Sequence, residues 1–207
     1  MLVSHNMAAV NALCSRCIIL NLGGVEFDGP TDQATARYYA ESLNMSSGSD
    51  LSGRRREGSG KARFSSIQIQ AVDAAGQRLA VASPGCDLQL QVELECRADF
   101  AHANLAVIIY DASGYRVVDT NTAQKGEFMS LQAGQIARAS FLLRDVLLRP
   151  GKYFIGLWLG REGVETIDDI EHATTLDFAE GTETNLHPVI FPGTYLCRFE
   201  QYISILQ

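Results

Sequence analysis

The only tryptophan of the chain, Trp158, lies in an apolar stretch that could present an aromatic ring to a ligand. In an extended segment alternate side chains point to opposite faces, so Phe154, Gly156 and Trp158 share one face of residues 153–159. We expect the glycine to leave open space beside the indole ring. Sugars are bound by aromatic faces together with a few polar groups that satisfy each buried hydroxyl. The alternative is that Trp158 packs in the core of a β-sandwich.

A second stretch offers further residues of the kind that bind sugars. Tyr110 points away from Ile109 on its segment, and residues 119–122 supply hydroxyl and amide groups. Tyr115 lies at the tip of a predicted hairpin. For residues 119–122 the alternative is a hydrogen-bonded strand end. The candidate carbohydrate-binding residues are Trp158, Tyr110, Asn121, Thr120, Phe154 and Tyr115.

Catalytic chemistry has little support in the sequence. A glycosidase needs two carboxylates across a cleft, whereas four acidic residues crowd one apparent turn, which favours a solvated loop: Glu165, Asp168, Asp169 and Glu171. Three histidines lack metal-ligand spacing and a nucleophile partner: His102, His172 and His187. We therefore expect no enzyme activity, no catalytic residue, no metal and no cofactor in this chain.

Composition narrows the class of protein and its partners. The 207 residues include 17 Lys and Arg against 24 Asp and Glu, for a net charge of −7, which argues against binding nucleic acid. No apolar run approaches the roughly 20 residues of a membrane-spanning helix, and the first residues do not resemble a signal peptide. The five cysteines are odd in number and scattered, and Cys14 and Cys17 lack a second pair for zinc, so we expect free thiols in a reducing cytoplasm.

Most of the chain has the pattern of β-strands. Residues 64–72 and 88–96 alternate apolar and polar side chains, which predicts strands with one face in a core. Residues 105–110 and 153–159 are apolar on both faces and should be central strands. Turns containing glycine separate these segments, and those at Asp73–Gly76 and Asp111–Gly114 share the same residue types, with Asp before the bend and Gly after it. The fold class is therefore mainly β, an antiparallel β-sandwich of jelly-roll or immunoglobulin-like type over residues 63–207.

The linker before this predicted sandwich and the C-terminal end of the chain differ from the other segments in composition and pattern. Residues 44–62 are rich in Ser, Gly and Arg and predict a flexible linker. Its arginines at positions 54–56 are either solvated or a patch for an acidic lipid or partner. Residues 188–207 contain two strand-like runs, which could pair with their own sheet or with the edge of a partner.

The first 43 residues predict a short α/β unit. A strand end, a polar turn and a helix precede a hairpin formed by residues 17–20 and 25–27, and Thr31 could cap a helix over residues 32–42. Residues 2–10, 14–20 and 27–30 resemble the tail of an ATP-binding-cassette (ABC) ATPase, starting at its switch-histidine loop. His5 matches the switch histidine, which in that family contacts the γ-phosphate.

The remaining ATPase motifs are missing, since the chain has no phosphate loop, signature motif or Walker B strand. The resemblance therefore implies that residues 1–43 are the remnant of an ABC ATPase domain and that His5 is orphaned. ATP and Mg²⁺ would bind only to the full-length ATPase.

An ATPase tail, a linker and a sandwich in this order resemble the ATP-binding subunits of ABC exporters of O-antigen-type polysaccharides. Landmarks of the sandwich are similar at residues 67–69, 107–111, 148–153 and 189–192. The resemblance implies non-catalytic binding of the exported glycan in lipopolysaccharide biosynthesis, by a C-terminal domain that forms a homodimer through strand exchange. It also implies a membrane-embedded exporter subunit as partner and a cytoplasmic location, peripheral at the inner membrane. The alternative is a structural dimerisation or regulatory module that does not touch glycan.

Overall fold

The computed structural model describes residues 10, 13–21, 23–31, 33–34, 37 and 50–179. His5 and residues 188–207 lie outside the described residues, so the predictions made for the switch-histidine loop and the C-terminal runs concern parts not described here. The described residues include no helix long and apolar enough to cross a membrane.

The N-terminal part contains the predicted hairpin. Strands β1 (Arg16–Asn21) and β2 (Gly24–Pro30) pair antiparallel. The Arg16 guanidinium donates two hydrogen bonds of 2.7 Å to the Asp28 carboxylate, one to each oxygen. The Thr31 hydroxyl donates to the Cys14 carbonyl at 2.6 Å, so it ties the end of β2 to the start of β1. The hairpin prediction is confirmed.

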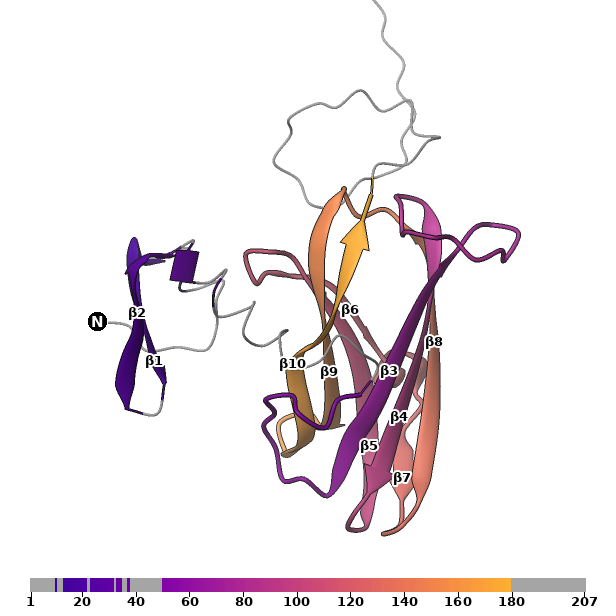
Figure 1. Cartoon of the computed structure of the whole chain (residues 1–207). Helices are drawn as coiled ribbons and strands as arrows, with labels where there is room; N and C mark the ends of the chain where they lie inside the picture. Colours follow the sequence, from indigo (N-terminus) through magenta and orange to yellow (C-terminus); the bar gives the residue numbers. More distant parts are fainter. Residues whose placement is uncertain are drawn as a thin grey trace, which may run out of the picture.

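The rest of the described chain forms two antiparallel sheets packed face to face (Figure 1). One sheet has the strand order β3-β4-β8, and the other has the order β10-β9-β5-β6, with β7 also paired to β5. The strands are β3 (Ala62–Val72), β4 (Cys86–Cys96), β5 (Phe100–Tyr110), β6 (Arg116–Asn121), β7 (Met129–Leu131), β8 (Ile136–Val146), β9 (Gly151–Arg161) and β10 (Glu165–Phe178), and a short 3₁₀ helix η1 (Thr122–Lys125) follows β6. The prediction of an antiparallel β-sandwich is confirmed.

The core lies between the two sheets and follows the alternation of the sequence. Leu105, Val107 and Ile109 of β5 face inward and are fully buried, as are Ile155 and Leu157 of β9. Burying such a side chain contributes about 1.5–3 kcal/mol. β5 and β9 occupy the middle of their sheet, which agrees with their apolar character on both faces.

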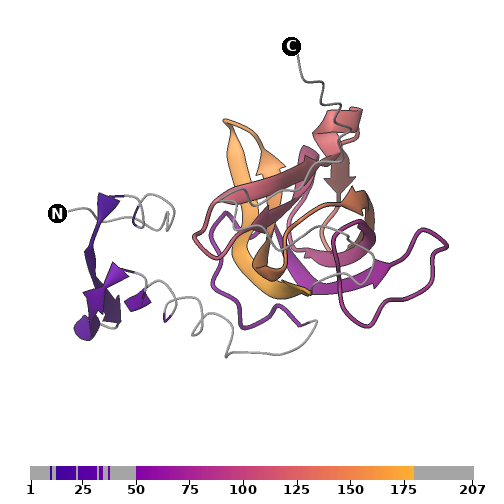
Figure 2. The same ribbon diagram turned by 90° about the horizontal axis from the view of Figure 1, so that it is seen from above.

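The two similar turns have the same hydrogen bonds. Asp73 Oδ1 accepts from the N–H groups of Ala75 and Gln77, and Asp111 Oδ1 accepts from those of Ser113 and Tyr115. The fourth residue of each turn is a glycine, with φ of 79° at Gly76 and 82° at Gly114. The first of these turns begins the connection from β3 to β4, which projects from the sandwich in both views (Figures 1 and 2).

Residues 50–60, which we call the strap, differ from the predicted flexible linker. Leu51 is completely buried in the core between the sheets. The backbone of Glu57 pairs with that of Asp169, so the strap lies along the free edge of β10 before the chain enters β3. The strap therefore closes one side of the sandwich, and the prediction of a flexible linker is wrong for residues 50–62.

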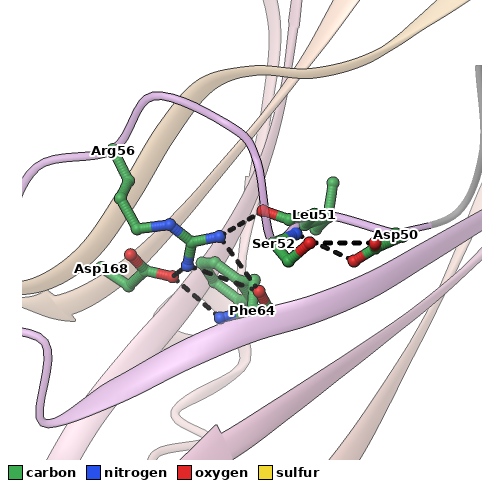
Figure 3. A network of polar contacts seen from close by, with 6 residues as sticks. All are labelled: Asp50, Leu51, Ser52, Arg56, Phe64 and Asp168. Atoms are coloured by element: carbon green, nitrogen blue, oxygen red, sulfur yellow. Dashed lines mark hydrogen bonds and ion pairs between the residues drawn. The ribbon is translucent and has the colours of Figure 1, made fainter. Parts of the chain in front are cut away.

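A buried ion pair holds the strap in place (Figure 3). Arg56 Nη1 donates to Asp168 Oδ2 at 2.9 Å, and the same carboxylate oxygen accepts from the backbone N–H of Phe64 at 2.8 Å. Arg56 also donates to the carbonyl of Leu51. The ion pair thus joins the strap, β3 and β10, and Arg56 is not a solvated residue of a tether.

The acidic cluster is also not the solvated loop that the sequence predicts. Its four carboxylates lie on strand β10, and Asp168 is only 1% exposed. Burial raises the pKa of Asp168, although its hydrogen bond from Phe64 and the charge of Arg56 oppose this shift. The strand was not recognised because β10 contains two register shifts, which interrupt the alternation of the sequence.

Candidate functional site

The outer face of the β10-β9-β5-β6 sheet carries a small apolar cluster of its own. Ala106, Ile108, Tyr110 and Phe154 are buried on this face, and Trp158 is half-buried beside them. None of the five belongs to the core between the sheets. Trp158 is therefore not a core tryptophan, and it shares its face with Phe154 and Gly156 as the sequence predicts.

Two glycines of β9 allow aromatic rings to pack directly against the backbone of the strand. A Cβ atom placed on Gly156 would lie 2.7 Å from Tyr110 Cε2, and one placed on Gly160 would lie 2.8 Å from Trp158 Cζ2. The expectation that Gly156 leaves open space beside the indole is wrong, because the ring of Tyr110 fills that space. Both rings consequently lie against the backbone of β9.

Replacing Gly156 with alanine should therefore displace the Tyr110 ring and change the outer face without removing an aromatic residue. The new methyl group would also lie 3.0 Å from the Glu171 carbonyl, which cannot move aside as a side chain can. We expect a loss of about 1–3 kcal/mol in the free energy of unfolding and a shift of the Tyr110 ring resonances in the NMR spectrum. Gly76→Ala is not a suitable control, because the φ of Gly76 is 79° and an alanine would be strained there. The control is Ser140→Ala, at an exposed position of β8 in the opposite sheet. Unchanged Tyr110 resonances in the Gly156 variant would contradict the close packing of the Tyr110 ring on Gly156.

A row of residues crosses the sheet at the level of Trp158. Asp169 of β10 is paired with Trp158 of β9, Trp158 with Ala106 of β5, and Ala106 with Asn121 of β6. Paired residues of antiparallel strands point to the same face. The row therefore places a carboxylate, an indole and an amide along one line on the outer face, and we call it the cross-strand row.

Polar groups surround this row. The Trp158 indole N–H donates to the Thr166 hydroxyl at 3.4 Å, and the Asn121 side-chain oxygen accepts from the backbone of Gln124 at 3.2 Å. On β6, Arg116 makes a 2.7 Å ion pair with Asp119. Planar polar side chains of this kind can exchange hydrogen bonds with sugar hydroxyls.

Tyr110 links the apolar cluster to these polar groups. Its ring lies 5.8 Å below the Arg116 guanidinium. Burial raises the pKa of the Tyr110 hydroxyl, and the positive charge of Arg116 opposes the shift. The hydroxyl therefore stays protonated at neutral pH and can act as a hydrogen-bond donor.

His172 packs behind the aromatic rings. Its ring centroid lies 5.1 Å from that of Phe154 and 6.1 Å from that of Tyr110, and the residue is 7% exposed. Burial lowers the pKa of His172 to about 4, and the positive charge of Arg54 on the strap adds to the shift. At neutral pH this imidazole is uncharged.

The structure brings together only some of the predicted site residues. Trp158, Tyr110, Phe154 and Asn121 share the outer face, although Tyr110 and Phe154 are only 8% and 3% exposed. Thr120 is paired with the core residue Val107 and donates to its carbonyl at 3.1 Å, as expected for a hydrogen-bonded strand end. Tyr115 is exposed in the turn before β6, away from the row.

Sequence reasoning missed three polar residues as parts of this face, all of them on β10: Thr166, Asp169 and His172. Asp119 lies in the predicted stretch 119–122, and its alternation with Asn121 places the two residues on the same face of β6. The residues of β10 gave no such signal, since the register shifts hide which of them share a face with Trp158.

The described part of the chain contains no candidate metal site, and its four cysteines are not in disulfides. Within it, no three potential metal-ligating side chains from His, Cys, Asp and Glu come together. Cys86 and Cys96 are buried free thiols, and Cys14 and Cys17 are half-buried free thiols.

Comparison with known proteins adds the family. Residues 53–191 match the family model of the Wzt C-terminal domain, and the match begins inside the strap. The chain belongs to this family. The Wzt C-terminal domain family is associated with an ABC exporter, so the sandwich is a component of an ABC transporter.

The solved structure of a Wzt C-terminal domain supports the sandwich fold. A crystal structure of the C-terminal domain of wzt matches with a TM-score of 0.58 and 19% identity, over 75% of this chain and 92% of that one. A Niemann-Pick type C2 protein from the Japanese carpenter ant matches with a TM-score of 0.39 and 11% identity, over 60% of this chain and 99% of that one. No significant match was found among the curated proteins.

Proposed function

We propose that this Wzt C-terminal domain is a non-catalytic binding domain for an exported polysaccharide of the O-antigen type. It would act as the C-terminal domain of the ATP-binding subunit of the exporter, at the cytoplasmic face of the inner membrane. The membrane-embedded subunit would be contacted through the ATP-binding part. Binding of the glycan would hold the lipid-linked polymer ready for export in lipopolysaccharide biosynthesis.

The single observation that carries this proposal is the position of Trp158. The indole lies outside the core, half-buried on an outer sheet face, in one row with Asp169 and Asn121. A flat aromatic ring flanked by polar planar groups suits the alternating apolar and hydroxylated surfaces of a sugar ring. Two copies in a homodimer would raise the apparent affinity for a repeating polymer through effective concentration.

Calorimetric titration of the whole chain with O-polysaccharide tests this proposal. The probe is the polysaccharide released from the lipopolysaccharide of the bacterium that encodes the chain. We expect saturable binding, which Trp158→Ala weakens about tenfold or more because the stacking surface is lost. Phe128→Ala serves as the control, since Phe128 is an exposed ring stacked on His102 at 4.0 Å and is not one of the paired residues of the row. Incubation with the protein should leave the length of the polysaccharide unchanged.

One observation favours a second candidate, a structural module that dimerises or regulates the ATP-binding part without touching glycan. Val10 of the N-terminal part packs against the apolar cluster of the outer face, and such a contact is expected if this face binds protein rather than glycan. A stable dimer in light scattering together with no binding of the polysaccharide would support this second function. Equal binding by the unaltered chain and Trp158→Ala would rule out the cross-strand row as the glycan site.

A further inference from the structure

The strap continues the sheet that carries the cross-strand row. The backbone N–H of Glu57 donates to the Asp169 carbonyl at 3.0 Å, and the N–H of Asp169 donates to the Glu57 carbonyl at 2.9 Å. Two residues that exchange both hydrogen bonds form a directly opposed antiparallel pair, and their side chains point to the same face. The side chain of Glu57 therefore lies on the face that bears Asp169 and Trp158.

Glu57 thus extends the cross-strand row by one position. The row runs from Glu57 on the strap through β10, β9 and β5 to Asn121 on β6. With neighbouring strands about 4.8 Å apart, five positions span roughly 19 Å, which is long enough for several consecutive sugar rings.

The side chain of Glu57 is available to a ligand. It is exposed, and its carboxylate makes no hydrogen bond or ion pair with any residue in the described part of the chain. The nearby Glu165 differs, because Lys61 binds its carboxylate at 2.8 Å. Glu57 is also not needed to hold the strap, which depends on its backbone pairing and on the ion pair of Arg56 with Asp168.

We propose that Glu57 is a further glycan-binding residue, and that a polysaccharide lying along the cross-strand row joins the strap to the sheet. This inference rests on the proposed function. An ionised carboxylate accepts hydrogen bonds from sugar hydroxyls, and such charge-assisted bonds are stronger than those between neutral groups. The site is then completed by a segment that the sequence assigns to the linker.

Glycan binding should consequently stabilise the strap. A ligand that contacts Glu57 and Trp158 together binds better when the strap is paired with β10 than when it is detached, so it shifts the strap toward the paired state. Pairing of the strap is reported by the N–H groups of Ser59 and Gly60, which donate to the carbonyls of Thr166 and Ile167. Since the strap follows the N-terminal part in the sequence, a strap held by glycan would restrict the chain that joins the two parts.

The test compares Glu57→Ala and Glu57→Gln with the control Glu95→Gln, using the whole chain and the same released O-polysaccharide. Glu95 is an exposed glutamate on β4 of the opposite sheet. We expect calorimetry to give about tenfold weaker binding for Glu57→Ala, a smaller loss for Glu57→Gln and no change for the control. In hydrogen exchange, the polysaccharide should slow the Ser59 and Gly60 amides of the unaltered chain, and slow them less in Glu57→Ala.

The outcomes separate this inference from the proposed function. If the unaltered chain binds the polysaccharide and Glu57→Ala binds it equally well, Glu57 is not a glycan contact and the inference is overturned. If the unaltered chain does not bind, the proposed function fails and the inference fails with it. Because Glu57 is exposed, both variants should melt within a few degrees of the unaltered chain, so weaker binding cannot be attributed to unfolding.

Discussion

Replacing Asp168 with alanine lowers the free energy of unfolding of the sandwich by about 3–5 kcal/mol, because it removes one partner of a buried ion pair. The side chains of Arg56 and Asp168 are only 12% and 2% exposed. Without the carboxylate, the Arg56 charge remains largely out of water and the Phe64 N–H loses its acceptor. Urea unfolding followed by the fluorescence of Trp158 measures this loss.

A matched control separates the buried ion pair from an ordinary surface pair. Glu93 pairs with Arg138 on the opposite sheet, where the arginine is 64% exposed, so Glu93→Ala should cost less than about 1 kcal/mol. The double replacement of Arg56 by Met and Asp168 by Leu should recover much of the stability lost in Asp168→Ala, since no unpaired charge is then buried. A loss below about 1 kcal/mol in Asp168→Ala would show that the ion pair does not hold the strap.

Acid destabilises the sandwich through His172. Its pKa is about 4 in the folded protein against 6.5 for the free side chain, so folding favours the neutral imidazole. The stabilisation is fully present above pH 6.5 and is lost as the pH falls toward 4, because the unfolded chain then binds a proton that the folded chain does not. The full shift corresponds to about 3 kcal/mol. Glu171 Oε2 lies 4.0 Å from His172 Nδ1, and its charge does not offset the effect of burial.

Comparison of the unaltered chain with His172→Gln isolates this effect from the other groups that titrate in acid. We expect the difference in unfolding free energy between pH 7 and pH 4.5 to be smaller in His172→Gln. The control His102→Gln should keep the full dependence, because His102 is exposed. An identical pH dependence in all three proteins would mean that folding does not change the pKa of His172, which would contradict the expected effect of its burial.

The strands of both sheets could be predicted from the sequence because the pattern that marks each strand lies within its own residues. Alternation along 88–96 gives a strand with one buried face, and apolar residues on both faces of 105–110 and 153–159 give central strands. The same alternation correctly groups Phe154, Gly156 and Trp158 on one face. Alternation within one strand does not show which residue lies beside it on the next strand. The sequence therefore did not predict that the ring of Tyr110 lies over Gly156.

The strap and β10 were missed for a different physical reason. Arg56 finds Asp168 across 112 residues of sequence, and no local pattern marks such a pair. In β10 the buried residues Ile167, Ile170 and Ala173 recur every third position, because register shifts interrupt the strand. A period of three does not resemble a strand, so the acidic residues among them suggested a loop.

The buried position of Leu51 and the pairing of Glu57 also determine where this sandwich can be divided from the chain before it. A fusion or domain exchange joined at Arg63 would remove Leu51 from the core, leave Asp168 without Arg56 and expose the edge of β10 to pairing with other chains. A joint placed before Asp50 keeps all three. The transplantable unit therefore begins at Asp50, inside the stretch whose composition suggests a disordered spacer.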